Sequence, residues 1–163
     1  EEFTFGKSTA KPVVANQPLN ERYKFNGVTT LTDGLKGTKN YKTGRWIAFY
    51  QNDMDVVIDL QQPTEIASVA FTACVEKGDW VFDARGFNVE VSDDGEHFTR
   101  VASADYPAMK EDDRNGVYEH KLTFTPVKTR YVHVVVPSEK SIPAWHGGKG
   151  RPGFLFVDEI TIE

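Results

Sequence analysis

The sequence has little cysteine, no excess of positive charge and no long apolar run. Cys74 is the only cysteine among 163 residues, which excludes an intrachain disulfide framework, and its apolar neighbours predict a small core residue rather than a nucleophile. A net charge of -5 without a visible basic stretch argues against a nucleic-acid partner, because such binding requires a positive surface. The sequence also contains no run of about 18 apolar residues, so no transmembrane segment is expected.

The chain begins at Glu1, without an initiator methionine or a signal-like segment. A length of 163 residues is sufficient for one domain with a sizeable core and too short for two ordinary domains. We therefore expect residues 1–163 to form a single domain that has been excised from a larger protein.

Alternation of apolar and polar residues is the dominant pattern. In FNVEVS, residues 87–92, the apolar side chains fall on every second position, which predicts a half-buried strand. The turn residues DDG at 93–95 separate it from EHFTRVA at 96–102. This arrangement is typical of a β-hairpin, because Asp and Gly tolerate the left-handed conformations of tight turns.

Further strands are predicted on both sides of this hairpin. Residues 55–60 and 65–74 form a pair separated by QQPT, residues 118–124 and 129–136 form a second predicted hairpin around TPVK, and residues 154–162 form the last strand. At least seven strands with no long amphipathic helix indicate an all-β fold, an antiparallel β-sandwich.

The glycine-rich segment before the last strand contains a misleading motif. Gly148, Gly150 and Gly153 match the G-x-G-x-x-G fingerprint of dinucleotide-binding proteins. That fingerprint must open a helix, whereas here it leads into the aromatic and β-branched run that begins at Phe154. The context therefore argues against nucleotide binding.

Oxygen-bearing side chains suggest a cation site. Glu159 lies in register with the apolar positions of the last strand, and a buried carboxylate needs a partner. Asp33 supplies a second carboxylate and Thr38 a hydroxyl, while Gly34 and Gly37 allow the intervening backbone to turn its carbonyls inward. Hard oxygen ligands favour calcium over zinc. The alternative is that Asp33 and Gly34 form an ordinary turn and Glu159 a solvated strand end.

A second group of residues is suited to sugar binding. Trp145, His146 and Arg151 place an aromatic plate, an imidazole and a planar cation in one glycine-rich loop. A pyranose offers both an apolar face and a rim of hydroxyls to such a group. Trp46 and Trp80 are further aromatics at loop edges, and each tryptophan either contacts a ligand or caps the sandwich.

No catalytic residues are predicted. A glycosidase requires two carboxylates that face each other across a glycosidic bond. Asp158 and Glu159 are adjacent in a strand, so their side chains are expected on opposite faces. The sequence also contains neither a G-x-S-x-G nor an H-E-x-x-H motif.

Three segments together resemble a known family. They are LTDGLKGTKNYKTGRWIAFYQNDMDVVIDL at 31–60, FNVEVSDDGEHF at 87–98 and WHGGKGRPGFLFVDEITI at 145–162. They resemble the coagulation factor V/VIII type C, or discoidin-like, domain. Within it they are most similar to the carbohydrate-binding module family 32 type that ends bacterial β-N-acetylhexosaminidases (chitobiases) of glycoside hydrolase family 20, particularly those of gut Bacteroidetes. The motifs occur in the family's order over nearly the whole chain.

The resemblance implies a jelly-roll, galactose-binding-like sandwich with structural calcium near its first loop. Carried onto this chain, the metal ligands would be the side chains of Asp33, Thr38 and Glu159 with the backbone carbonyls of Leu35 and Asp158. The family binds galactose-like and N-acetylated sugars through variable loops at one end. The candidate sugar contacts, chosen by chemistry and loop position, are Trp145, His146, Arg151, Trp46, Trp80 and Arg85.

These observations lead to an expected function. The chain is expected to be a non-catalytic module that holds a parent glycoside hydrolase, of β-N-acetylhexosaminidase type, close to its glycan. One alternative is a structural accessory domain that packs on the catalytic domain of the same chain without binding sugar. Another is a discoidin-type adhesion module. The resemblance also implies a secreted, periplasmic or outer-membrane-associated location in a bacterium.

Overall fold

The computed structural model describes residues 2–3, 5–43 and 45–163, and within them the chain is built almost entirely of β-strands. The strands are β1 Glu2–Phe3, β2 Val13–Ala15, β3 Leu35–Lys36, β4 Ile47–Tyr50, β5 Met54–Val75, β6 Gly86–Ser92, β7 Thr99–Asp105, β8 Gly116–Val136 and β9 Phe154–Ile162. Short 3-10 helices span η1 Gly27–Thr32, η2 Tyr41–Thr43 and η3 Lys77–Asp79. The expected all-β class is confirmed.

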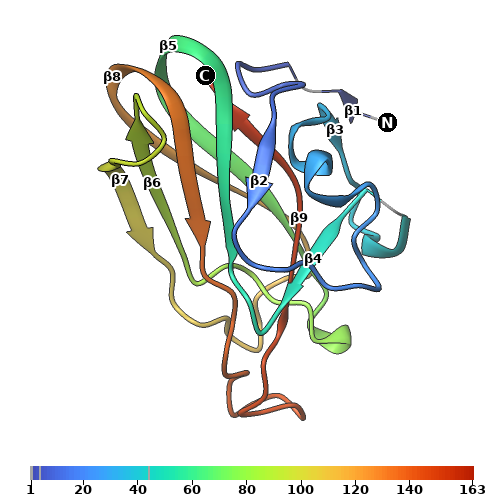
Figure 1. Ribbon diagram of the computed structural model, residues 1–163. Coiled ribbons are helices and arrows are strands. Elements are labelled where there is room, and N and C mark those ends of the chain that lie inside the picture. The colour runs from blue at the N-terminus through green and yellow to red at the C-terminus, as the bar shows by residue number, and fades with distance from the viewer. Residues whose placement is uncertain (1, 4, 44) are drawn as a thin grey trace.

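Two long strands, β5 and β8, connect the two layers of the sandwich (Figure 1). They pair with each other in antiparallel register along both halves, with Val57 opposite His133 and Phe71 opposite His120. The first half of β5 also pairs with β2, and its second half pairs with β9. One layer therefore contains β2, β6 and β7, the other contains β4 and β9, and the halves of β5 and β8 contribute to both.

This arrangement corrects two predicted pairings. Residues 55–60 and 65–74 do not form a hairpin, and neither do residues 118–124 and 129–136, because each pair belongs to one continuous strand. The register shifts between Asp59 and Thr64 mark the corner where β5 leaves one layer for the other. Turn-forming residues at such a corner look the same in sequence as a hairpin loop. The hairpin of β6 and β7 is confirmed, with Phe87 opposite Ala104.

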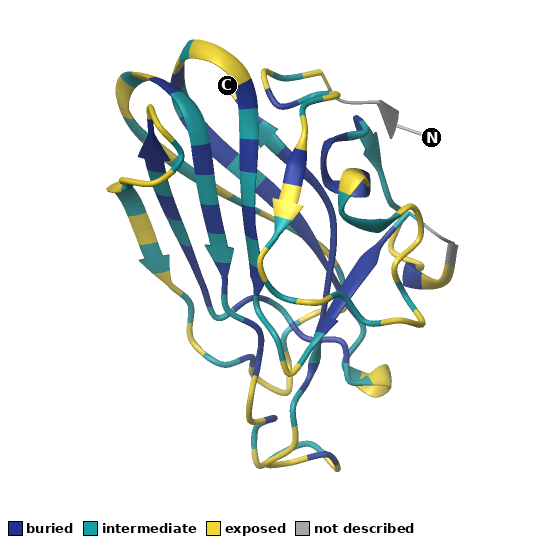
Figure 2. Ribbon diagram, viewed as in Figure 1, coloured by how far each residue is buried: buried dark blue, intermediate teal, exposed yellow. Residues whose placement is uncertain are grey.

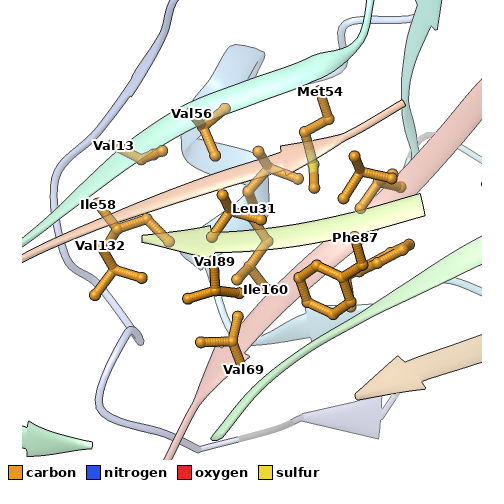
Figure 3. Close-up of a cluster of buried hydrophobic side chains, with 14 of the residues drawn as sticks. Val13, Leu31, Met54, Val56, Ile58, Val69, Phe87, Val89, Val132 and Ile160 are labelled. Atoms are coloured by element: carbon orange, nitrogen blue, oxygen red, sulfur yellow. The ribbon is translucent and has the colours of Figure 1, made fainter. Parts of the chain in front are cut away.

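The main core lies between the two layers (Figure 3). Val56, Ile58, Val89, Val132 and Ile160 are fully buried there. Their positions alternate with more exposed residues along each strand, as the bands in Figure 2 show. Each such side chain contributes roughly 1.5–3 kcal/mol by leaving water, so the inward-facing positions hold the two layers together.

A second apolar cluster covers the outer side of the β4–β9 layer. It contains the buried residues Tyr41, Trp46, Ala48, Cys74, Val81 and Phe156. Cys74 is fully buried, as predicted, and burial raises the pKa of its thiol to about 12. This cysteine is therefore a core residue and not a nucleophile.

Three connections meet at one end of the sandwich. They are residues 76–85 between β5 and β6, residues 106–115 between β7 and β8, and residues 137–153 between β8 and β9. Figure 1 shows the 137–153 connection at the end opposite to the C-terminus. We call this region the loop end. In the described part of the chain, no helix has the length and apolar character that crossing a membrane requires.

Candidate functional site

The two carboxylates of β9 lie in a β-bulge. Val157 pairs with Ala73 and Ile160 pairs with Phe71, so Asp158 and Glu159 together oppose the single residue between them on β5. A bulge of this kind redirects side chains that would otherwise alternate between faces. The expectation that these two carboxylates point to opposite faces is therefore wrong.

Both carboxylates face the segment from Asp33 to Gly37. Asp158 Oδ2 accepts a hydrogen bond from the backbone N–H of Gly37 at 2.8 Å, and its other oxygen accepts from the Thr72 hydroxyl. Glu159 Oε2 accepts from the backbone N–H of Gly34 at 3.0 Å. Both side chains are almost completely buried. Glycine amides thus anchor the loop to the last strand.

Burial changes the acidity of both groups. The pKa of Glu159 is raised to about 10. Burial is the main cause, and the hydrogen bond and the charge of the Asp33 carboxyl contribute in the same direction. Burial also raises the pKa of Asp158 to about 6, although hydrogen bonds from Thr72 and Gly37 oppose this change. The buried Glu159 and the half-buried Asp33 therefore form a carboxyl pair that requires either a shared proton or a cation.

The predicted metal ligands are only partly assembled. Asp33 and Glu159 are brought together, and the backbone N–H of Leu35 donates to Asp33 Oδ1 at 2.8 Å. Thr38 is exposed, its hydroxyl accepts from Asn40 N–H at 3.3 Å, and its carbonyl accepts from the Trp46 indole. The Asp158 carboxylate is occupied by Gly37 and Thr72, so its backbone carbonyl is the group left for a metal.

The chemistry of this donor set suits a hard cation. No cluster of three or more His, Cys, Asp or Glu side chains occurs in the residues that the structure describes. A cation here would therefore be held by two carboxylates, hydroxyl oxygen and backbone carbonyls. Such all-oxygen sets, rich in carbonyls, are those that calcium accepts. The residues present fit the expected ion.

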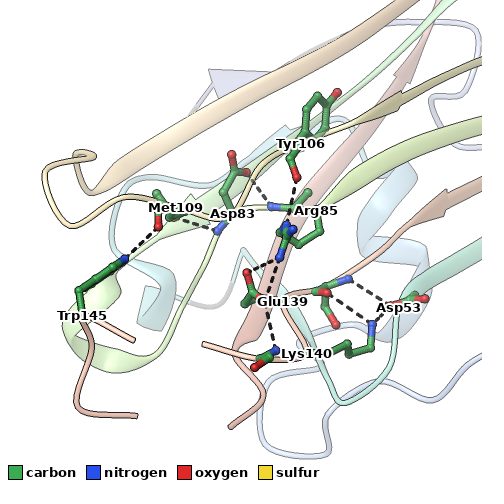
Figure 4. Close-up of polar contacts among 11 residues, drawn as sticks. Asp53, Asp83, Arg85, Tyr106, Met109, Glu139, Lys140 and Trp145 are labelled. Atoms are coloured by element: carbon green, nitrogen blue, oxygen red, sulfur yellow. Dashed lines mark hydrogen bonds and ion pairs between the residues drawn. The ribbon is translucent and has the colours of Figure 1, made fainter. Parts of the chain in front are cut away.

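At the loop end, Arg85 is held by the backbone and by a buried acid (Figure 4). Its Nε–H donates to the Tyr106 carbonyl at 3.0 Å, and Nη1 donates to both Glu139 oxygens at 3.2 and 3.0 Å. The Glu139 side chain is 2% exposed, whereas that of Arg85 is 37% exposed. The guanidinium is thus fixed on its inner edge and open to solvent elsewhere.

Glu139 was not among the predicted site residues. It lies in the polar stretch PSEKS, where a glutamate has the sequence signature of a solvated loop residue. The structure instead buries its carboxylate, which also accepts the backbone N–H of Ser141 at 3.1 Å. No local pattern reveals this role, because Arg85 lies 54 residues away in the chain.

Trp145 is half-buried, and its side chain makes contacts within the protein on two sides. Its indole N–H donates to the Met109 carbonyl at 3.1 Å. The Lys77 ammonium lies 5.5 Å from the centre of its ring. The residue packs with Phe82 and Met109 in a small apolar cluster. A ligand could therefore reach only the remaining surface of this ring.

His146 has a structural role in this arrangement. Its Nδ1 accepts the backbone N–H of Gly148 at 2.8 Å, and its Nε2 lies 2.7 Å from the Lys77 carbonyl. The carbonyl can only accept, which assigns the proton to Nε2. Both ring nitrogens are consequently occupied by the backbone. Sugar binding by His146 stays a prediction, and in this structure its ring nitrogens are engaged by Gly148 and Lys77.

The remaining candidates lie in different places. Trp80 is half-buried beside His146, with ring centres 6.2 Å apart, and adopts a left-handed conformation at φ 66°. Arg151 is exposed at the end of the same loop. Trp46 is 1% exposed and its indole N–H donates to the Thr38 carbonyl at 2.8 Å. It packs in the second apolar cluster, and a sugar contact by Trp46 stays a prediction.

The fold described above is an antiparallel β-sandwich in which three connections gather at one end. The sequence model of the F5/8 type C domain matches residues 13–152. That range covers most of the chain, and the chain therefore belongs to the F5/8 type C domain family. The search of curated proteins found no match to this chain.

Solved structures share this fold at low sequence identity. A fucose binding module of Streptococcus pneumoniae has a TM-score of 0.60 and 15% identity, covering 98% of this chain and 94% of that one. CpGH89CBM32-5 from Clostridium perfringens, solved in complex with GalNAc-β-1,3-galactose, has a TM-score of 0.56 and 15% identity, covering 95% and 94%. SpGH29 has a TM-score of 0.57 and 14% identity, covering 97% of this chain, which spans only 27% of SpGH29.

Proposed function

We propose that this protein is a non-catalytic carbohydrate-binding module whose ligand site lies at the loop end. The observation that carries the proposal is the geometry of Arg85. A guanidinium fixed by Tyr106 and Glu139, with its outer edge in solvent, is pre-organised to donate to sugar hydroxyls. The exposed part of the Trp145 ring supplies an apolar surface at the same end.

The family and these donors support a choice of ligand class. We propose galactose-like or N-acetylated sugars, in line with the GalNAc-β-1,3-galactose bound by the Clostridium relative. The module would hold a parent glycoside hydrolase, of β-N-acetylhexosaminidase type, near its glycan and so raise the local enzyme concentration. A secreted, periplasmic or outer-membrane-associated location in a bacterium would suit this role.

A calcium ion at the Asp33–Glu159 pair forms part of this proposal. The support is the carboxyl pair itself, which has no cationic side chain among its hydrogen-bond partners in the described residues. Thr38 and the carbonyls of Leu35 and Asp158 would complete the set of oxygens. Calcium would neutralise the pair and hold the Asp33–Gly37 segment against β9.

A second candidate function is a structural accessory domain that packs on the parent catalytic domain without binding sugar. The observation that favours it is the commitment of Trp145 and His146 to internal contacts. A loop that is rigid and whose polar groups are satisfied is suited to packing against a protein surface.

Titration of isotope-labelled protein with millimolar sugars separates the two candidates. Galactose, N-acetylgalactosamine and N-acetylglucosamine would be added in calcium buffer while the amide, arginine and indole resonances are followed by NMR. Saturable shifts at Arg85 and Trp145 that disappear in Arg85→Lys support the binding module. A folded protein whose spectrum does not change with any of these sugars supports the accessory domain instead.

A further inference from the structure

A groove formed by residues that are remote in sequence from the loop end combines aromatic rings with cations. It is lined by Arg22, Tyr23, Phe25, Tyr41, Lys42 and Trp46. Its volume of about 430 Å³ lies in the range of small-molecule sites. None of the lining residues carries a carboxylate, in a chain whose net charge is -5. We call it the basic groove.

The cations of the basic groove stand over its rings. The Arg22 guanidinium lies 5.4 Å from the centre of the Tyr23 ring, and the Lys42 ammonium lies 5.7 Å from that of Tyr41. Tyr23 and Tyr41 contact each other edge-on at 5.9 Å. Neighbouring ring surfaces and positive charges are thereby presented together.

These charges are not neutralised within the described structure. Neither Arg22 nor Lys42 forms an ion pair there. Of the acids near these residues, Glu21 pairs with Lys24 at 2.8 Å, and Asp79 accepts from the hydroxyl of the groove residue Tyr41 at 2.8 Å. The groove therefore carries an excess of positive charge that an anion would relieve.

Phe25 is an independent indication of a ligand. Its side chain is 42% exposed although it is large and apolar. Its backbone has a positive φ of 39°, which is costly for a non-glycine residue. The Arg45 guanidinium lies 5.4 Å from the centre of its ring. A strained backbone that exposes an aromatic ring beside a cation is typical of a binding surface.

We propose that the basic groove binds an acidic sugar, with the pyranose face on the exposed Phe25 ring and its carboxylate or sulfate on Arg22 and Lys42. The concave shape favours a saccharide over a membrane surface, and the acidic chain as a whole disfavours anionic lipid. The inference goes beyond the proposed function. It shares with it only the choice of a carbohydrate ligand, and it concerns different residues.

The test is an NMR titration of the full chain with sodium glucuronate and with its neutral methyl ester. We expect saturable shifts of the amides of residues 22–25 and 41–42 with glucuronate and about tenfold weaker binding of the ester, since charge-assisted contacts would be lost. The double variant Arg22→Gln/Lys42→Gln should weaken glucuronate binding by about tenfold or more. The matched control Arg100→Gln/Lys128→Gln, which makes the same charge change at exposed positions, should leave it unchanged.

Several results would overturn the inference. They are equal affinity for glucuronate and its ester, equal affinity for inorganic sulfate alone, or no binding of glucuronate while vesicles of phosphatidylcholine and phosphatidylserine bind. Arg85→Lys distinguishes this site from the loop end. It should abolish shifts caused by neutral sugars and leave those caused by glucuronate, so failure of either site is read separately.

Discussion

Arg85 reaches across 54 residues of sequence to a glutamate, Glu139, whose side chain is only 2% exposed. The pair joins the end of the β5–β6 connection to the connection between β8 and β9, and it leaves the outer edge of the guanidinium in solvent. Stability and the proposed ligand binding therefore depend on the same side chain, and variants must be chosen to separate them.

Arg85→Lys should separate binding from folding. Lysine keeps a positive charge for Glu139 but loses the planar fork, so we expect sugar affinity to fall by about tenfold or more with a small loss of thermal stability. Arg85→Met leaves Glu139 buried and unpaired and should cost up to about 3–5 kcal/mol, the value for a fully buried pair. Calorimetric titration and urea unfolding measure the two effects. Equal sugar affinity in Arg85→Lys would remove Arg85 from the site.

Removal of calcium should lower the thermal stability of the protein. The reason is that the Asp33–Glu159 carboxyl pair then loses the cation that neutralises it. We expect a lower melting temperature in EDTA, restored by added calcium and not by magnesium, which demands stricter octahedral geometry.

Glu159→Gln provides the matching variant. It removes the charge but keeps an oxygen that can accept the Gly34 amide, so its melting temperature should be independent of calcium and, in EDTA, higher than that of the unsubstituted protein. Glu163→Gln, at an exposed position, serves as the control. An unsubstituted protein whose melting temperature is the same in EDTA and in calcium would contradict the metal site.

Gly37→Ala should destabilise the protein. An added methyl group would lie 2.2 Å from the Trp46 indole nitrogen, and the Trp46 side chain is fully buried. Overpacking of this kind costs about 1–3 kcal/mol. Gly147→Ala is the matched control, because a methyl group there meets nothing within 4 Å. Urea unfolding followed by tryptophan fluorescence compares the two variants. Equal stability would show that Gly37 and Trp46 can shift to accommodate the methyl group.

His146→Ala should loosen the loop end. It removes the acceptor of the Gly148 amide and the donor to the Lys77 carbonyl, with an expected cost of about 1–3 kcal/mol. Hydrogen exchange of the Gly148 amide should accelerate. His97→Ala removes a side chain that is 86% exposed and should have little effect on stability. Unchanged exchange at Gly148 would mean that the histidine does not hold this loop.

Most of the strands could be predicted from the sequence, whereas their partners could not. The β6–β7 hairpin was correct because its strands are joined by a short turn with a local signature. The corners QQPT and TPVK have the same turn-forming residues, yet each lies within one strand. Whether such a segment reverses the chain depends on which distant strand lies alongside it. Here β5 and β8 lie alongside each other over both halves, so each continues through its corner and does not fold back on itself.

The candidate sites divide in the same way. The sequence identified Asp33 and Glu159 as companions through motifs in the family's order, and the structure brings the two together. It could not show that a bulge opposite Thr72 turns Asp158 and Glu159 to the same loop, because alternation predicts the opposite.

The sequence by itself determined the all-β class and the family, because strand periodicity and turn chemistry are local properties of the chain. Only the tertiary structure decided which loop residues are available to a ligand. His146 is occupied by a carbonyl 69 residues away, and Arg85 is aimed by a glutamate 54 residues away. The availability of a polar side chain depends on the partners that folding brings to it, and hydrogen bonds between distant segments leave no periodic trace in the sequence.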